Sequence, residues 1–361
     1  MIKRNSCRDA GTTSEHSCGI EGASTGVDAD ARVGNDAESA GSRTDAQGAG
    51  HPGSDASSSP GPGTPPDACS SDRRLTARKG LNLYLLVDDS LSVVLQPAWN
   101  SLTLAISAFV DDPGNTGVGF GIGYYGISCN GSDYMTPTVR VAPLPDPAQA
   151  IKSTYPLPIS GKALTPAVTG ALSYARSLVF ADADRDTSMI LVTDGIADPL
   201  CGSTEASAAQ AIAAGFQDPA SVRTYVIALG AGPTLLDPAN IIDLSPLDAL
   251  AAAGGTKQAR RIEVNLSTNS ELTTALDDTV TAALPCAYKI PSDVDPSRAA
   301  LEWQSGTDVA PWPRVSSAAA CGDQPGCFVR KEAPTYLELC PKACAMLKAT
   351  PHGTVFLRTC N

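Results

Sequence analysis

Leu81–Ser92 reads Leu-Asn-Leu-Tyr-Leu-Leu-Val-Asp-Asp-Ser-Leu-Ser, an apolar run that stops at two carboxylates and two hydroxyls. An apolar run of this length, bounded by polar residues, is typical of a strand that is buried on both faces of a sheet. The polar residues would then lie at the carboxyl end of the strand, the edge at which open α/β sheets bind ligands. Asp88, Ser90 and Ser92 follow the spacing D-x-S-x-S, and such oxygen donors in a tight loop suit Mg²⁺ or Ca²⁺.

Segments of strand and helix character alternate after this stretch. Further strands are predicted at 117–125, 138–141, 188–193, 222–229 and 261–265. Helices are predicted after Pro97 and at about 146–154, 165–175, 203–215 and 270–284. This alternation predicts an α/β fold with a doubly wound, mainly parallel sheet that is flanked by helices.

A second motif follows a later strand, which reads Met189-Ile-Leu-Val-Thr-Asp-Gly195. With the D-x-S-x-S motif and the alternation between the two, residues from about 81 to 286 resemble the von Willebrand factor A (vWA) domain. The chain looks like the bacterial secreted or cell-envelope type, with a cysteine-rich C-terminal extension. The resemblance implies a Rossmann-like fold with a metal-ion-dependent adhesion site. Asp88, Ser90, Ser92 and Asp194 would hold Mg²⁺, or Ca²⁺ or Mn²⁺, in that site.

The loop that supplies a threonine in this family departs from the family's pattern. Here it reads Gly161-Lys-Ala-Leu-Thr-Pro-Ala167, so Lys162 falls where the threonine belongs and Thr165 comes three residues later. Thr165 is expected to cap the next helix, and it is also the remaining candidate for the missing ligand. An ammonium beside Asp88 and Asp194 would compete with a cation for the same carboxylates. Either the metal site persists, or the fold is retained while metal binding is weakened or lost.

Composition limits the partners and the compartment. The chain of 361 residues has a net charge of −12, which argues against a nucleic-acid partner. Eleven cysteines imply an oxidising compartment, so we expect an extracellular or cell-envelope location. The first residues contain no apolar core of a classical signal peptide, and no apolar run approaches transmembrane length.

Three regions are expected along the chain. Residues 1–78 are rich in Gly, Ala, Ser, Pro and Asp, which predicts a disordered linker, or tether. Residues 79–285 form the vWA-like domain, and residues 286–361 a small cysteine-rich β appendage in which disulfides are favoured over zinc ligation. Cys129 and Cys201 both follow strands that end at the metal-site edge, so we expect them to pair. Cys69 and Cys286 both lie at the opposite edge, and we expect a second disulfide between them.

Two functions are compatible with this pattern. The first is an exported adhesion or protein-binding module, whose protein or surface ligand offers a carboxylate to the metal. The alternative is a non-catalytic accessory subunit of an intracellular ATPase or chelatase-type complex. An enzyme is not expected, because no nucleophile–base constellation is present in the sequence.

Overall fold

The structure is a computed structural model that describes residues 69, 72–90, 93, 98–156, 161–195, 201–217, 220–231, 245–264, 268–330, 335–350 and 353–360. All of these residues fall in one compact unit. Within these ranges, no helix combines the length and the apolar character that crossing a membrane requires.

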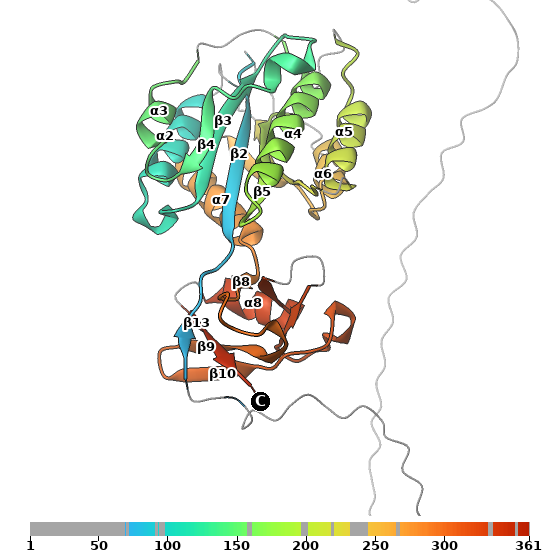
Figure 1. The fold of residues 1–361 in the computed structure, drawn as a ribbon. Helices are drawn as coiled ribbons and strands as arrows, with labels where there is room; N and C mark the ends of the chain where they lie inside the picture. Colours follow the sequence, from blue (N-terminus) through green and yellow to red (C-terminus); the bar gives the residue numbers. More distant parts are fainter. Residues whose placement is uncertain are drawn as a thin grey trace, which may run out of the picture. The chain divides into compact units, whose positions relative to one another are not determined.

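A six-stranded sheet forms the centre of the first part (Figure 1). Its strand order is β4-β3-β2-β5-β6-β7, and every neighbouring pair is parallel except β3 and β4. The predicted doubly wound, mainly parallel sheet is therefore confirmed. The bounds are β2 Gly80–Asp88, β3 Gly119–Tyr125, β4 Val139–Pro143, β5 Arg185–Thr193, β6 Arg223–Ala231 and β7 Arg260–Val264.

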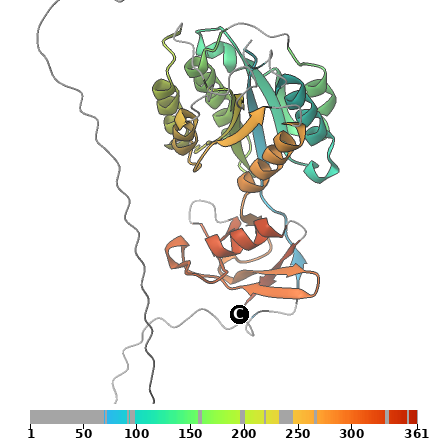
Figure 2. The same cartoon turned by 180° about the vertical axis from the view of Figure 1, so that it is seen from behind.

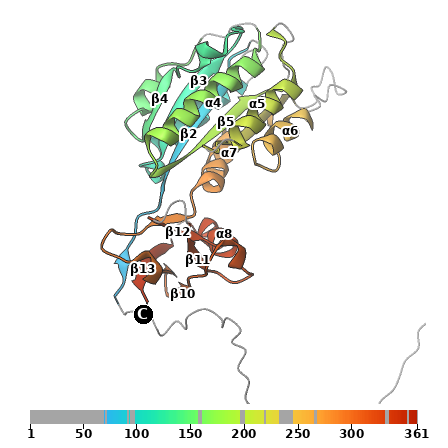
Figure 3. The ribbon, with the colours of Figure 1, turned by 45° about the vertical axis from the view of Figure 1, so that its right-hand side comes forward.

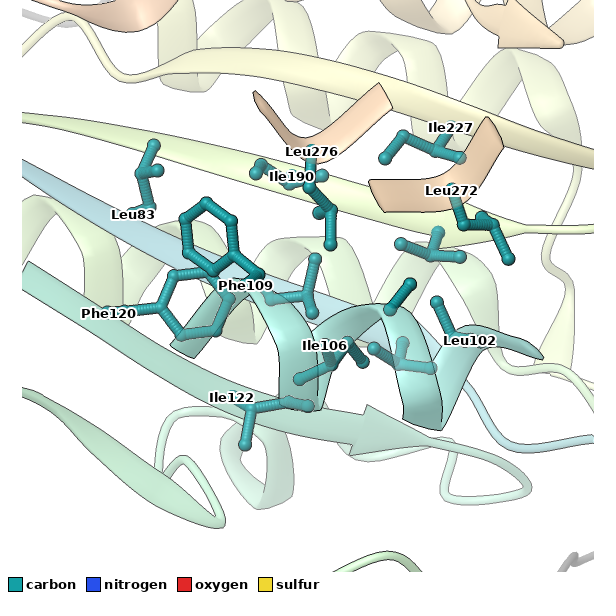
Figure 4. Packing of buried hydrophobic residues seen from close by; sticks show 14 of the residues in the cluster. Leu83, Leu102, Ile106, Phe109, Phe120, Ile122, Ile190, Ile227, Leu272 and Leu276 are labelled. Atoms are coloured by element: carbon teal, nitrogen blue, oxygen red, sulfur yellow. The ribbon is translucent and has the colours of Figure 1, made fainter. Parts of the chain in front are cut away.

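The central strand β2 is buried on both faces, which explains its apolar run from Leu83 to Val87. Successive side chains of a strand point to opposite faces. Leu83 and Leu85 accordingly belong to one hydrophobic cluster, whereas Tyr84 and Leu86 belong to another. Figure 4 shows the first cluster, in which Leu83 lies among side chains of β3, β5, β6, α2 and α7.

Two layers of helices cover the sheet. Residues of α2, α3 and α7 contribute to the first cluster, and residues of α4, α5 and α6 to the second. Figure 2 shows α7 in front of the sheet, and Figure 3 shows α4 and α5 in front of it from the other side. The bounds are α2 Ala98–Asp111, α3 Ala148–Lys152, α4 Leu164–Ala181, α5 Glu205–Gln217, α6 Ser245–Ala253 and α7 Thr268–Ala283.

Two helix predictions differ from the structure. The helix α6 was not predicted, although its buried residues Leu247, Leu250 and Ala251 recur at helical spacing. The expected cap at Thr165 is wrong, because α4 starts at Leu164 and Ala163, two residues earlier, occupies the cap position. Thr165 therefore lies within the first turn of α4, where its side chain is available for other contacts.

The C-terminal part is built from two small antiparallel sheets and one helix. The sheets have the orders β1-β13-β9-β10 and β11-β12-β8, and their shared core includes Trp303, Trp312 and Leu337. The helix α8 was not predicted. The bounds are β1 Arg74–Leu75, β8 Ala287–Lys289, β9 Ala299–Ser305, β10 Asp308–Trp312, β11 Cys327–Val329, β12 Tyr336–Leu339, α8 Pro341–Ala349 and β13 Thr354–Thr359.

The disulfides confirm one predicted pair and contradict the other. Cys129 pairs with Cys201, as predicted. The predicted pair of Cys69 with Cys286 is wrong, since Cys69 pairs with Cys360 and Cys286 with Cys344. The reason is that β1, which follows Cys69, joins the C-terminal sheet beside β13 instead of the α/β sheet. A fourth disulfide, Cys321–Cys340, lies in the same part.

The C-terminal part contacts the amino ends of the α/β strands. Asp184 directly precedes β5 and accepts hydrogen bonds of 2.6 Å from Lys289 and from the Tyr336 hydroxyl. These two hydrogen bonds lower the pKa of Asp184. Arg78 donates to the carbonyl of Pro285 near the end of α7. The contacts lie at the amino ends of the strands, whereas Asp88 and Asp194 lie at the carboxyl ends.

Candidate functional site

Asp88 and Asp194 meet at the point where the strand order of the sheet reverses. Asp88 ends β2, and Asp194 directly follows β5, the parallel neighbour of β2. The chain runs outward from β2 to β3 and β4, then returns to β5 on the other side of β2. Ligands of open α/β sheets bind at such a switch point. Both aspartates are buried, with 0% and 2% of their surface exposed.

Asp88 is held by three hydrogen-bond donors. Its Oδ1 accepts from the backbone N–H of Ser90 at 2.9 Å. Its Oδ2 lies 2.9 Å from the Thr193 hydroxyl and 3.3 Å from the Tyr125 hydroxyl. The Thr193 hydroxyl also accepts from the N–H of Gly195 at 3.2 Å. These bonds fix the Asp88 carboxylate between β2, β3 and β5.

Lys162 places an ammonium between the two aspartates. Its Nζ forms an ion pair with Asp194 Oδ1 and lies 3.7 Å from Asp88 Oδ2. Lys162 is 8% exposed. The backbone N–H of its neighbour Ala163 donates a 2.7 Å hydrogen bond to the carbonyl of Gly126, and this bond fixes the position of the segment. Burial lowers the pKa of Lys162, and the negative charge of Asp88 opposes this shift. The lysine thus offsets part of the buried negative charge.

The residues at this edge do not fit a divalent cation in the arrangement that the structure shows. A cation bound by Asp88 and Asp194 would have to displace the Lys162 ammonium. Like unit charges about 4 Å apart repel by roughly 4 kcal/mol at an effective dielectric constant of 20, and a divalent ion by about twice that. Within the described ranges, no three His, Cys, Asp or Glu side chains gather in a way that could hold a metal.

The other predicted ligands lie in different places. Ser90 is buried, and its backbone N–H donates to Asp88 Oδ1 at 2.9 Å. Ser92 lies outside the described residues. The Thr165 hydroxyl contacts the Ser207 hydroxyl at 2.6 Å, so this side chain connects α4 to the first turn of α5.

Three residues of the cluster were missed by the sequence analysis. Tyr125 lies beside Asp88 in the strand register, and burial raises its pKa well above the usual value. Thr193 directly precedes Asp194 in the T-D-G motif. Asp89 is buried, and its Oδ1 has no hydrogen-bond partner among the described residues. Burial, and to a smaller extent the negative charge of Asp88, raises the pKa of Asp89 to about 6. Asp89 and Thr193 lie within the two sequence motifs and could have been found there. Tyr125 could be found only from the strand register, which pairs it with Asp88.

A disulfide clamps the loops beside this cluster. Cys129 lies after β3, and Cys201 lies between Asp194 and α5, so their bond joins two loops at the carboxyl edge. The short 3₁₀ helix η3, Gly131–Tyr134, packs against α4. Ile127 and Met135, on either side of this segment, are 52% and 48% exposed. The loop that follows β3 is therefore held by a disulfide and by packing on α4, and it carries two exposed apolar side chains.

No protein-family model matches this chain, and a search of curated proteins finds no match. Similar folds occur in solved structures. Proximal thread matrix protein 1 of the mussel byssus has a TM-score of 0.42 and 15% identity, over 60% of this chain and 50% of that chain. The pilus adhesin SpaC of Lactobacillus rhamnosus GG has a TM-score of 0.43 and 12% identity, over 80% and 40%. The manganese-loaded TRAP protein of Plasmodium vivax has a TM-score of 0.38 and 14% identity, over 76% and 98%.

The match spans half or less of the mussel protein and of the pilus adhesin, and likenesses of this size concern the fold alone. The strand order, the single antiparallel edge strand and the helices on both faces agree with the sequence resemblance. The first part of the chain therefore has a von Willebrand A-like α/β fold.

Proposed function

We propose that the chain is an exported protein-binding module, which contacts its ligand at the carboxyl edge of the six-stranded sheet without a divalent cation. The observation that carries this proposal is the ion pair of Lys162 with Asp194 beside Asp88. A built-in ammonium takes the role that the family resemblance gives to a metal. It connects the segment that leads into α4 with the carboxyl ends of β2 and β5.

A binding role is favoured over catalysis by the way the buried groups are used. The carboxylate of Asp88 accepts three hydrogen bonds, and the ammonium of Lys162 is paired with Asp194. A general base or nucleophile needs a reactive atom that faces a substrate. These buried groups contact one another instead, so the cluster serves as support for a contact surface.

The contact surface that we propose is the disulfide-clamped loop between β3 and β4. Ile127 and Met135 are large, exposed and apolar, and the Cys129–Cys201 bond limits the freedom of their loop. Large exposed apolar side chains on a rigid element are favourable anchors for a protein partner, because little conformational freedom is lost on binding. We expect the energetic centre of the interface at these two side chains.

The charge of the edge bears on the ligand. Asp88, Asp89 and Asp194 are buried together with one cation, Lys162. An added carboxylate would face surplus negative charge there unless a metal ion accompanied it. A ligand with apolar and basic groups is therefore favoured, and a carboxylate that binds through Mg²⁺ is the competing outcome.

Disulfides support export over the alternative of an intracellular ATPase or chelatase subunit. The described cysteines form four disulfides. Such bonds form and persist in oxidising environments and are rare in the cytosol. A reduced intracellular complex would leave the loop at Cys129 without its clamp.

The test is a peptide-display selection against the immobilised full chain, carried out in parallel in EDTA and in 5 mM MgCl₂. Selected peptides should bind equally in both buffers. They should lose at least tenfold in affinity for an Ile127→Ser, Met135→Ser double variant. Phe180→Ser is the matched control, since Phe180 is exposed near the other end of α4. Binding that requires Mg²⁺, or that is lost in the Phe180 variant and retained in the loop variant, would refute the proposal.

A further inference from the structure

The Cys129–Cys201 disulfide differs from the other disulfides in its exposure to solvent. Cys129 is exposed, whereas every other disulfide-bonded cysteine in the described ranges is buried or half-buried. Access controls which disulfide a thiol in solution attacks, and exposed disulfides are the ones that are reduced most readily. The sulfur of Cys129 is therefore the most favourable target for a small thiol.

This disulfide lies against one of the two proposed contact residues. The sulfurs of Cys129 and Cys201 lie 4.0 and 3.8 Å from the backbone carbonyl oxygen of Ile127. Ile127 precedes Cys129 by two residues, and its side chain is 52% exposed. The position of Ile127 is therefore coupled directly to the state of the bond.

The other contact residue, Met135, is held by packing instead. Met135 follows η3, which packs on α4. A Cβ atom at Gly170 of α4 would collide with the carbonyl oxygen of Gly131, so the two backbones are in close contact. Tyr134 is 8% exposed and belongs to the second hydrophobic cluster. Cleavage of the disulfide would leave these contacts of η3 intact.

Residues 127–130 depend more strongly on the covalent bond. The hydroxyl of Tyr134 donates to the carbonyl of Ser128 at 3.0 Å, and the hydroxyl of Ser128 donates to Asp133 at 2.5 Å. Ser128 and Asp133 bond at the exposed surface of the loop, where water competes for the same groups. Without the disulfide, residues 127–130 would retain only these hydrogen bonds to η3 among the described contacts of the loop.

Reduction by a small dithiol proceeds in two balanced steps. A thiolate of the dithiol attacks the sulfur of Cys129, the disulfide breaks, and Cys201 leaves as a thiolate that takes a proton from water. The second thiolate of the dithiol then attacks the mixed disulfide and releases Cys129, which is protonated in turn. The dithiol is oxidised to a cyclic disulfide and the protein gains two thiols. The described free thiol, Cys327, is buried and does not take part.

We infer that Cys129–Cys201 is a thiol-sensitive switch of the contact surface. The oxidised form holds Ile127 in place for the ligand, and reduction by a small dithiol loosens residues 127–130 and weakens binding. The effect on the ligand rests on the proposed function. The order in which the disulfides are reduced and the loosening of the loop do not depend on it.

The order of reduction is tested on the native full chain with dithiothreitol. Samples are trapped with N-ethylmaleimide at successive times and analysed by peptide mapping. Cys129 and Cys201 should be labelled at least tenfold faster than the cysteines of the three disulfides in the C-terminal part, with Cys286–Cys344 as the internal reference. Earlier labelling of another disulfide, or simultaneous labelling of all four, would overturn the inference.

The effect on the loop is tested with a Cys129→Ser, Cys201→Ser double variant, by hydrogen exchange and mass spectrometry. Exchange at residues 127–130 should accelerate at least fivefold, while exchange at residues 131–135 stays unchanged. If the double variant does not fold, as judged by its thermal midpoint, the same measurement is made on protein in which dithiothreitol has opened this bond alone.

Binding is tested with peptides selected on the oxidised full chain. They should bind the double variant at least fivefold more weakly than the unmodified protein. Equal affinity, or unchanged exchange at residues 127–130, would overturn the switch and leave the proposed function standing. Failure of the proposed function shows differently, as selected peptides whose affinity the Ile127→Ser, Met135→Ser variant does not change.

Discussion

Replacing Lys162 by Met should destabilise the fold far more than its loss of one hydrogen bond suggests. The substitution retains an apolar stem of similar length and removes the ammonium. Asp194 would keep its buried charge without the cation that now pairs with it. Asp88 would retain its hydrogen bonds from Ser90 and Thr193, so the deficit arises mainly at Asp194.

The magnitude follows from the burial of the pair. Asp194 is 2% exposed and Lys162 is 8% exposed. Removing one partner of a buried ion pair costs about 3–5 kcal/mol, because a buried charge remains uncompensated. Since 1 kcal/mol shifts the midpoint of a domain of this size by roughly 2–4 °C, a decrease of at least about 6 °C is expected.

Lys152→Met is the matched control. Lys152 forms an ion pair with Asp111, with side chains 28% and 54% exposed. A surface pair of this kind contributes about 0–1 kcal/mol. The assay is urea unfolding followed by circular dichroism, with thermal midpoints measured at the same pH. Equal, small losses for Lys152→Met and Lys162→Met would refute the reasoning, because Lys162 would then be solvated.

Three further predictions address the metal, the thiol and the N-terminal segment. Lys162→Thr should raise the affinity for Mg²⁺ at least tenfold, about 1.4 kcal/mol, by calorimetry; an unchanged affinity would show that the lysine does not compete. Burial raises the pKa of Cys327 to about 12, so its thiol stays protonated at pH 7–9. Peptide mapping should therefore find Cys327 alkylated only when the protein is denatured. Alkylation of the native protein would contradict its burial. A chain that starts at Asp67 should melt within a few degrees of the full chain. A chain that starts at Thr76 loses the Cys69–Cys360 disulfide and should melt far lower. The sequence separation of 291 residues gives this disulfide an entropic contribution on the order of 5–6 kcal/mol. Equal midpoints for the two truncated chains would argue against the disulfide.

The fold class was predictable because its signal is local. The segments Leu83–Val87 of β2 and Met189–Val192 of β5 are buried, apolar runs of strand length. The helix α6 was missed because its nine residues include only three buried positions, which are too few to establish a helical period from the sequence. The strand β1 has two residues, too few to display any periodicity, and its assignment to the linker also led to the wrong partner for Cys69.

The candidate site was predictable to the extent that it lies in motifs. The sequence motifs of three loops identified Asp88, Lys162 and Asp194 as site residues. In the structure, Lys162 lies between the two aspartates. Tyr125 joins the cluster only because β2 and β3 align Asp88 with Tyr125, and no local pattern specifies that register. The contact of Thr165 with Ser207 depends on where α4 begins, which sequence patterns define poorly.

In the proposed site, the Lys162 ammonium stands where a divalent cation would otherwise bind. This placement is tested most directly by a crystal structure of the full chain grown in 10 mM MnCl₂, with anomalous diffraction collected at the manganese edge. No manganese signal is expected between Asp88 and Asp194, and the ammonium of Lys162 should contact Asp194. A manganese peak at those carboxylates, with Lys162 turned away from them, would contradict it.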